Sequence, residues 1–167
     1  GGTIACGLSG PRRPYTGAAR DFVLGTTVLT GDGQILRFGG EVMKNVAGYD
    51  ISRLMCGALG TLGVLLEISL KVLPRPACEE TIQLDLPVAE AIESMNRWAA
   101  QPLPLSGACH DGGSVFLRLS GAEAAVRAAR EQLGGSTLAG SDSFWMQVRE
   151  HAHPFFDSDH ALWRLSV

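Results

Sequence analysis

The pattern of apolar and polar residues near the start of the chain predicts a β-hairpin. Residues 22–30 (FVLGTTVLT) are apolar or β-branched, as strand residues are, and residues 31–33 (GDG) form a strong turn signal. Residues 34–38 then return to an apolar pattern, so we expect them to pair with the first strand. Residues 3–5 (TIA), at the beginning of the chain, also have the composition of a strand.

A glycine-rich stretch follows the hairpin and leads into a short helix and a long apolar strand. Six glycines occur within residues 39–63, which indicates tight turns or a backbone pressed against a ligand. Asp50 can cap a helix over residues 51–55, which Gly57 would end. Residues 64–73 alternate imperfectly and predict a largely buried strand, which the following PRP sequence stops.

The second half of the chain alternates between strand and helix patterns. Residues 81–86 (TIQLDL) alternate cleanly, and an apolar stripe typical of helix core packing covers residues 87–101, with the proline at the first helical position. Ser120 and Glu123 have the spacing of a capping box for a helix that the glycine pair at 134–135 ends. The other predicted elements are strands over 105–110, 115–119 and 161–167 and a helix over 144–152. This order predicts a ferredoxin-like α+β arrangement, which by itself indicates no function.

The composition excludes several classes of protein. A net charge of −3 without a basic stripe argues against a nucleic-acid binder. The most apolar run, residues 59–73, contains Glu67 and Lys71 and cannot span a bilayer. The four cysteines form no CxxC pair, so the sequence suggests reduced thiols rather than a zinc or iron–sulfur site. No export signal is visible, the initiator methionine is absent and both ends resemble strand interiors, so we expect a segment of a longer protein.

The heptapeptide at residues 57–63 (GALGTLG) is the strongest candidate for a ligand-binding loop. Its glycines are evenly spaced by three, so it is neither the GxGxxG of a Rossmann dinucleotide site nor a phosphate-binding GK[ST] loop. It precedes a strand, where backbone N–H groups can face a ligand. From the spacing alone, a structural turn and a cofactor loop both remain open.

Five motifs in order along the chain resemble one family. They are GGTIA at 1–5, RDFVLG at 20–25, DG at 32–33, KNVAGYD at 44–50 and GTLGV at 60–64. Together they resemble the second half of the FAD-binding domain of vanillyl-alcohol oxidase-type, or PCMH-type, flavoproteins, and in particular the glycolate oxidase subunits. The resemblance implies an α+β fold, with the C-terminal half of a PCMH-type FAD-binding domain at residues 1–76. A partial ferredoxin-like α+β domain on the substrate side would follow at 77–167.

The resemblance also places a cofactor site on particular residues. The segment Gly1, Gly2, Thr3, Ile4 and Ala5 would run along the FAD, where small residues permit close approach of the backbone. Gly60, Thr61, Gly63 and Val64 would make main-chain contacts, on the adenosine side of the cofactor. Asp21 would either contact the cofactor or hold a loop through backbone N–H groups. Lys44 would either bring positive charge to the reduced flavin or be a solvated loop residue, and we expect Tyr49 and Asp50 to shape the helix start.

The function implied is the oxidation of glycolate, a 2-hydroxy acid, by an FAD-dependent oxidoreductase subunit. Electrons would pass to an iron–sulfur partner subunit, with a sibling flavoprotein subunit in the same complex. The alternative is a non-catalytic scaffold subunit whose FAD is structural or lost. We expect a cytoplasmic location, with the complex able to hold the subunit at the inner face of the bacterial plasma membrane.

Two departures from the family pattern affect these expectations. The glycine loop that cradles the cofactor pyrophosphate in this family lies upstream of the segment matching Gly1, so we expect these 167 residues alone to bind FAD weakly or not at all. The His-rich metal motif of related dehydrogenases is also absent. His151, His153, Asp157, Asp159 and His160 form the only candidate cluster, and the two-residue spacing of the first pair on a helix argues against a metal site.

Overall fold

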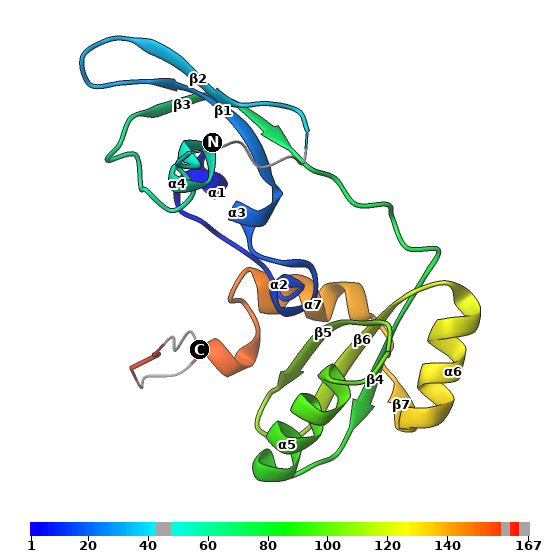
Figure 1. Cartoon of the computed structure of the whole chain (residues 1–167). Coiled ribbons are helices and arrows are strands. Elements are labelled where there is room, and N and C mark those ends of the chain that lie inside the picture. Colours follow the sequence, from blue (N-terminus) through cyan, green and yellow to red (C-terminus); the bar gives the residue numbers. More distant parts are fainter. Residues whose placement is uncertain (43–47, 158–160, 164–167) are drawn as a thin grey trace. The chain divides into compact units, whose positions relative to one another are not determined.

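The chain folds into two compact units, Gly1–Pro74 and Arg75–Val167, each with its own sheet (Figure 1). The structure is a computed structural model that describes residues 1–42, 48–157 and 161–163. The mixed helix and sheet content agrees with the predicted α+β fold class.

Unit 1 is built on a three-stranded antiparallel sheet with the order β2-β1-β3. The predicted hairpin is confirmed, because β1 and β2 pair on either side of the turn at residues 31–33. The elements of this unit are α1 (Gly2–Ala5), α2 (Arg13–Thr16), α3 (Ala19–Phe22), β1 (Val23–Leu29), β2 (Ile35–Gly39), α4 (Ile51–Leu54) and β3 (Val64–Leu70).

Helix α4 is fixed to the sheet by a chain of hydrogen bonds through its buried serine. Ser52 Oγ donates to the carbonyl of Phe38 at 3.0 Å and accepts from Thr26 Oγ1 at 3.3 Å. The predicted cap is also confirmed, since Asp50 Oδ1 accepts from the amide of Arg53 at 3.0 Å. The side chains of Val28 and Met55 are buried. A small core therefore lies between α4 and one face of the sheet.

Two expectations for unit 1 are wrong. The first residues form the helical turn α1 rather than a strand, since the amide of Ala5 donates to the carbonyl of Gly1 and that of Cys6 to the carbonyl of Gly2. Strand β3 is not largely buried: Val64, Leu66 and Leu70 are each about half exposed. Strand β3 is exposed because it is an edge strand, and α4 contacts the sheet through β1 and β2.

Unit 2 has a four-stranded antiparallel sheet with the order β5-β6-β4-β7. Its first six elements follow the strand, helix, strand, strand, helix, strand order of the ferredoxin-like arrangement. The elements are β4 (Cys78–Leu84), α5 (Val88–Ala99), β5 (Leu105–His110), β6 (Val115–Gly121), α6 (Glu123–Leu133), β7 (Ser136–Thr137), α7 (Ser141–Arg149) and the 3₁₀ helix η1 (Pro154–Phe156).

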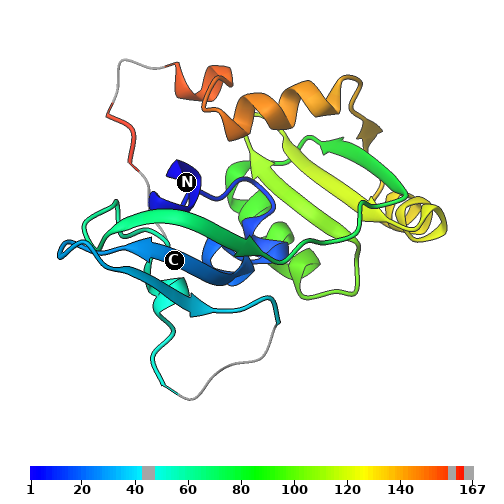
Figure 2. The same cartoon turned by 90° about the horizontal axis from the view of Figure 1, so that it is seen from above.

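The two faces of this sheet have different character. On one face α5 and α6 cover an apolar core that consists of Ile82, Ala91, Val115, Leu117, Leu119, Val126 and Ala129. The neighbouring residues Thr81 and Arg118 point to the opposite face, as alternation along a strand requires. There Trp145 of α7 (orange in Figure 2) donates from Nε1 to Thr81 Oγ1 at 2.9 Å and stacks on the guanidinium of Arg118 at 4.7 Å.

Several predicted details of unit 2 are wrong. Ser120 does not cap α6, because it lies in β6 and shares a hydrogen bond of 2.6 Å with Ser106 Oγ; the N-cap residue is Ala122. Pro87 is the N-cap residue of α5 rather than its first helical residue, and α7 begins earlier than predicted. The last strand of the sheet is β7, whereas residues 161–163 are irregular and 164–167 lie outside the described residues.

Candidate functional site

Two segments that are far apart in the sequence meet at one pocket of unit 1. We call this the glycine pocket. It has a volume of about 260 Å³ and is lined by Gly1, Gly2, Ala5, Met55, Gly60, Gly63, Val64 and Leu65. The structure thus brings together six of the residues for which the sequence predicts cofactor contacts, from both predicted segments.

Backbone hydrogen bonds hold the two segments side by side. The amide of Gly57 donates to the carbonyl of Ile4 at 3.0 Å, and the amide of Leu59 donates to the carbonyl of Ala5 at 2.8 Å. These carbonyls are at the end of α1, where a helix leaves its acceptors unsatisfied. The loop after α4 therefore caps α1, and this contact fixes the shape of the pocket.

The glycines of the loop serve different purposes. Gly63 has a φ of 143°, and a β-carbon there would lie 2.7 Å from the carbonyl oxygen of Leu29, so the fold itself requires glycine. Gly60 has a φ of 79°, but its β-carbon would meet no atom within 4 Å, and the same open space surrounds Gly1 and Gly2. A ligand can therefore approach the backbone closely at these three positions.

The pocket fits one side of a dinucleotide cofactor. Small residues on both segments leave the backbone accessible, and Val64 and Leu65 add apolar surface. Among the described residues, the amide of Gly60 has no hydrogen-bond acceptor, so it can donate to an oxygen or nitrogen of a ligand. These properties agree with the close approach and main-chain contact that the motifs predict.

The other predicted site residues lie outside the pocket lining. Thr61 Oγ1 donates to the carbonyl of Ala58 at 2.6 Å and so closes the loop on itself. Ile4 is buried, and the carbonyl of Thr3 accepts from the amide of Leu8. Asp21 Oδ2 accepts from the amide of Ala18 at 2.8 Å, which is the loop-holding role that the sequence left open.

Met55 and Leu65 line the pocket although the sequence did not predict them. Met55 follows the last residue of α4, where an apolar residue indicates only core. Leu65 alternates with Val64 along β3, and the sequence pattern gave no sign that both would reach the same pocket.

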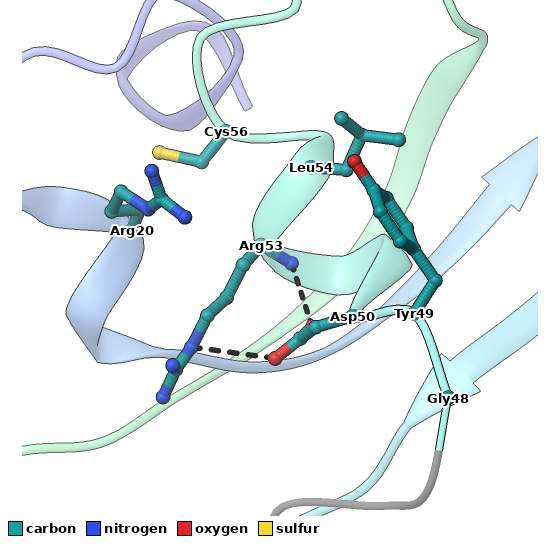
Figure 3. A pocket seen from close by; sticks show the side chains of 7 residues that line it. All are labelled: Arg20, Gly48, Tyr49, Asp50, Arg53, Leu54 and Cys56. Atoms are coloured by element: carbon teal, nitrogen blue, oxygen red, sulfur yellow. Dashed lines mark hydrogen bonds and ion pairs between the residues drawn. The ribbon is translucent and has the colours of Figure 1, made fainter.

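A second pocket lies beside α3 and α4, and we call it the arginine pocket (Figure 3). Its volume is about 570 Å³, and its lining residues are Arg20, Gly48, Tyr49, Asp50, Arg53, Leu54 and Cys56. Asp50 and the carbonyl of Tyr49 shape the start of α4, as expected, since the latter accepts from the amide of Ile51. Burial is the main cause that raises the pKa of Cys56, with Arg20 opposing it and Asp21 adding to it. Lys44 lies outside the described residues.

The histidines near the end of the chain follow α7 rather than lying on it. The ring of His151 packs on Phe156 with centroids 4.8 Å apart, and that of His153 packs on Phe144 at 5.2 Å. Asp159 and His160 lie outside the described residues. Within the described part of the chain, no group of three or more His, Cys, Asp or Glu side chains could hold a metal ion, and no helix is long and apolar enough to cross a membrane.

Comparison with known proteins reveals relatives in sequence and in structure. The chain is 55% identical over all 167 residues to glycolate oxidase subunit GlcE of Escherichia coli, of which it covers 47%. The chain is related to the E subunit of glycolate oxidase. This confirms the family resemblance, and it agrees with the sequences GLSGPRR and MKNVAGYDISRL, which favour the E subunit over the D subunit.

A weaker similarity connects this GlcE-related chain to the D subunit. It is 42% identical over 82 residues, 49% of the chain, to glycolate oxidase subunit GlcD of Bacillus subtilis, of which it covers 17%. Among solved structures, an alkyldihydroxyacetonephosphate synthase matches with a TM-score of 0.69 at 16% identity, over 93% of the chain and 36% of that protein. The predicted α+β fold class is thereby confirmed, since the chain has the same fold as part of that synthase. No family model matches the chain.

Proposed function

We propose that the protein is an FAD-binding subunit of a glycolate (2-hydroxy-acid) oxidase complex. The observation that carries this proposal is the 55% identity to GlcE over the whole chain, which spans about half the length of that relative. In this proposal, residues 1–76 are part of the FAD-binding domain and residues 77–167 are part of a ferredoxin-like domain on the substrate side. Bound FAD would supply the two-electron oxidation of the hydroxyl-bearing carbon, and an iron–sulfur partner subunit would receive the electrons.

The glycine pocket is where this chain would hold its side of the cofactor. Gly1, Gly2 and Gly60 would let the backbone lie against the cofactor, with Gly60 on its adenosine side, because open space surrounds each of them. The amide of Gly60 would donate a hydrogen bond to the ligand, and Val64 would give apolar contact. Ile4 and Thr61 would act indirectly, the first by packing α1 and the second by closing the loop.

Sibling subunits are part of the same proposal. The similarity to GlcD over about half of the chain supports a related flavoprotein subunit in the complex. We further propose that the complex places this subunit in the cytoplasm, at the inner face of the plasma membrane.

The test is to express the full-length protein without partner subunits and to add glycolate in the absence of oxygen. We expect a yellow protein whose flavin absorbance bleaches on adding glycolate. A yellow protein that never bleaches would favour the scaffold function, and a colourless protein would contradict FAD binding.

A matched pair of variants tests the site itself. Gly2→Val places a side chain beside the glycine pocket without meeting any atom of the chain within 4 Å at its β-carbon, so we expect it to fold and to lose most of its flavin. Gly31→Val, in the hairpin turn, has the same open surroundings away from the pocket and should keep its flavin. Equal flavin content in both variants would place the cofactor elsewhere.

A further inference from the structure

The arginine pocket contains two guanidinium groups that come from different helices. Arg20 belongs to α3 and Arg53 to α4, and contact between these two short helices brings both side chains to the lining. Figure 3 shows the two guanidinium groups on the same side of α4. Two cations that line one pocket give it a positive potential, which favours an anionic ligand.

The anionic group of the pocket compensates only part of this charge. Asp50 Oδ2 lies 3.4 Å from Arg53 Nε, which is buried and makes no hydrogen bond. The same carboxylate is also committed to capping α4. Among the described residues, the side chain of Arg20 makes neither a hydrogen bond nor an ion pair, and the terminal nitrogens of Arg53 make no hydrogen bond. A guanidinium has five N–H donors, so most of those in this pocket are available.

Among the described residues, the other lining groups add no further negative charge. The pKa of the Cys56 thiol is raised, chiefly by burial, so this thiol stays neutral near neutral pH. Tyr49 and Leu54 also line the pocket and are 77% and 42% exposed, and Figure 3 shows their side chains on the other side of α4 from the two guanidinium groups. The volume of about 570 Å³ is within the usual range for small-molecule sites.

We propose that the arginine pocket binds a small anion through a carboxylate or phosphate group held by Arg20 and Arg53. Guanidinium groups suit this role because their paired N–H donors match the oxygens of both anions. Within the described part of the chain this site shares no lining residue with the glycine pocket, so the proposal does not depend on flavin binding.

The test is a titration of the ¹⁵N-labelled protein, followed by the Nε–H and backbone amide signals of Arg20 and Arg53. Glycolate and inorganic phosphate are added separately at constant ionic strength, with sodium chloride as the reference. We expect at least one of them to shift these signals saturably. Saturation by glycolate alone identifies a carboxylate site, and saturation by phosphate alone identifies a phosphate site.

Arginine variants test the assignment to these two residues. Arg20→Gln and Arg53→Gln should each weaken binding about tenfold or more, because each removes hydrogen bonds between charged groups. Arg37→Gln is the matched control, since Arg37 is an exposed arginine of the same unit that forms an ion pair with Glu67 and does not line the pocket. Signal shifts that follow ionic strength alone, or equal weakening of binding in all three variants, would overturn the proposal. The titration of the unaltered protein shows whether an anion binds at all, even if a variant fails to fold.

Discussion

Replacing Gly63 by alanine should destabilise unit 1 far more than the same replacement at Gly60, three residues earlier in the same loop. Both residues have positive φ, 143° and 79° respectively, so both substitutions strain the backbone. Only at Gly63 would the new methyl group overlap other atoms, 2.7 Å from the carbonyl oxygen of Leu29 and 2.7 Å from a methyl carbon of Val28.

The magnitudes follow from these two differences. A positive φ costs an ordinary residue about 1–2 kcal/mol. Overlap in a packed region adds about 1–3 kcal/mol, and one of the overlapping atoms belongs to the paired backbone of β1, which cannot move aside as a flexible side chain can. We therefore expect the free energy of unfolding to fall by about 1–2 kcal/mol for Gly60→Ala and by about 2–5 kcal/mol for Gly63→Ala.

Urea unfolding measured by far-UV circular dichroism and by amide hydrogen exchange checks this prediction. The three tryptophans of the chain are all in unit 2, so exchange of the β1 and β3 amides must report on unit 1 while fluorescence reports on the other unit. Gly31→Ala, in open surroundings, is the control and should change stability by less than about 1 kcal/mol. Equal losses for Gly60→Ala and Gly63→Ala would refute the steric argument.

Three more predictions concern single side chains. Trp145→Phe should lower the free energy of unfolding by about 1–3 kcal/mol, through loss of a buried hydrogen bond and a cation–π contact, whereas Trp163→Phe, 88% exposed, should change it by less than about 0.5 kcal/mol in urea melts. Burial raises the pKa of Cys109 to about 12, so a thiol reagent at pH 8 should label exposed Cys6 before Cys109. For the same reason the free energy of unfolding should fall as pH rises from about 9 towards 12, because over this range the Cys109 thiol ionises only in the unfolded state. Asp50→Ala should cost about 0.5–2 kcal/mol by removing the cap of α4, with Asp50→Asn close to wild type in the same melts.

Elements with strong local signals could be predicted from the sequence. The hairpin depends on a turn sequence between two β-branched runs, and the start of α4 depends on the side chain of Asp50, so neither needs distant residues. The elements that were predicted wrongly or not predicted depend on tertiary contacts. Helix α1 ends against the loop at residues 57–59, and β7 has two residues, which is too short for any periodicity. Ser120 matches a capping motif but is held in β6 by Ser106.

For the candidate site too, local motifs could be predicted from the sequence and tertiary contacts could not. The sequence pointed to Gly1–Ala5 and to Gly60–Val64 as separate segments through a family resemblance, and the structure adds that they meet at one pocket. The arginine pocket could not be predicted, because Arg20 and Arg53 are far apart in the sequence and no motif specifies a spacing between them. Their proximity depends on the contact between α3 and α4.

The hydrogen bonds between α1 and the loop at residues 57–59 also have a consequence for folding. Ile4 and Ala5 accept hydrogen bonds from residues about 50 positions later in the chain, so closing this loop costs about 3–4 kcal/mol in chain entropy before the hydrogen bonds can form. The hairpin and α4 use nearer neighbours and can form first. During synthesis, the first five residues must therefore wait until the loop has left the ribosome, and the glycine pocket should be among the last parts of unit 1 to form.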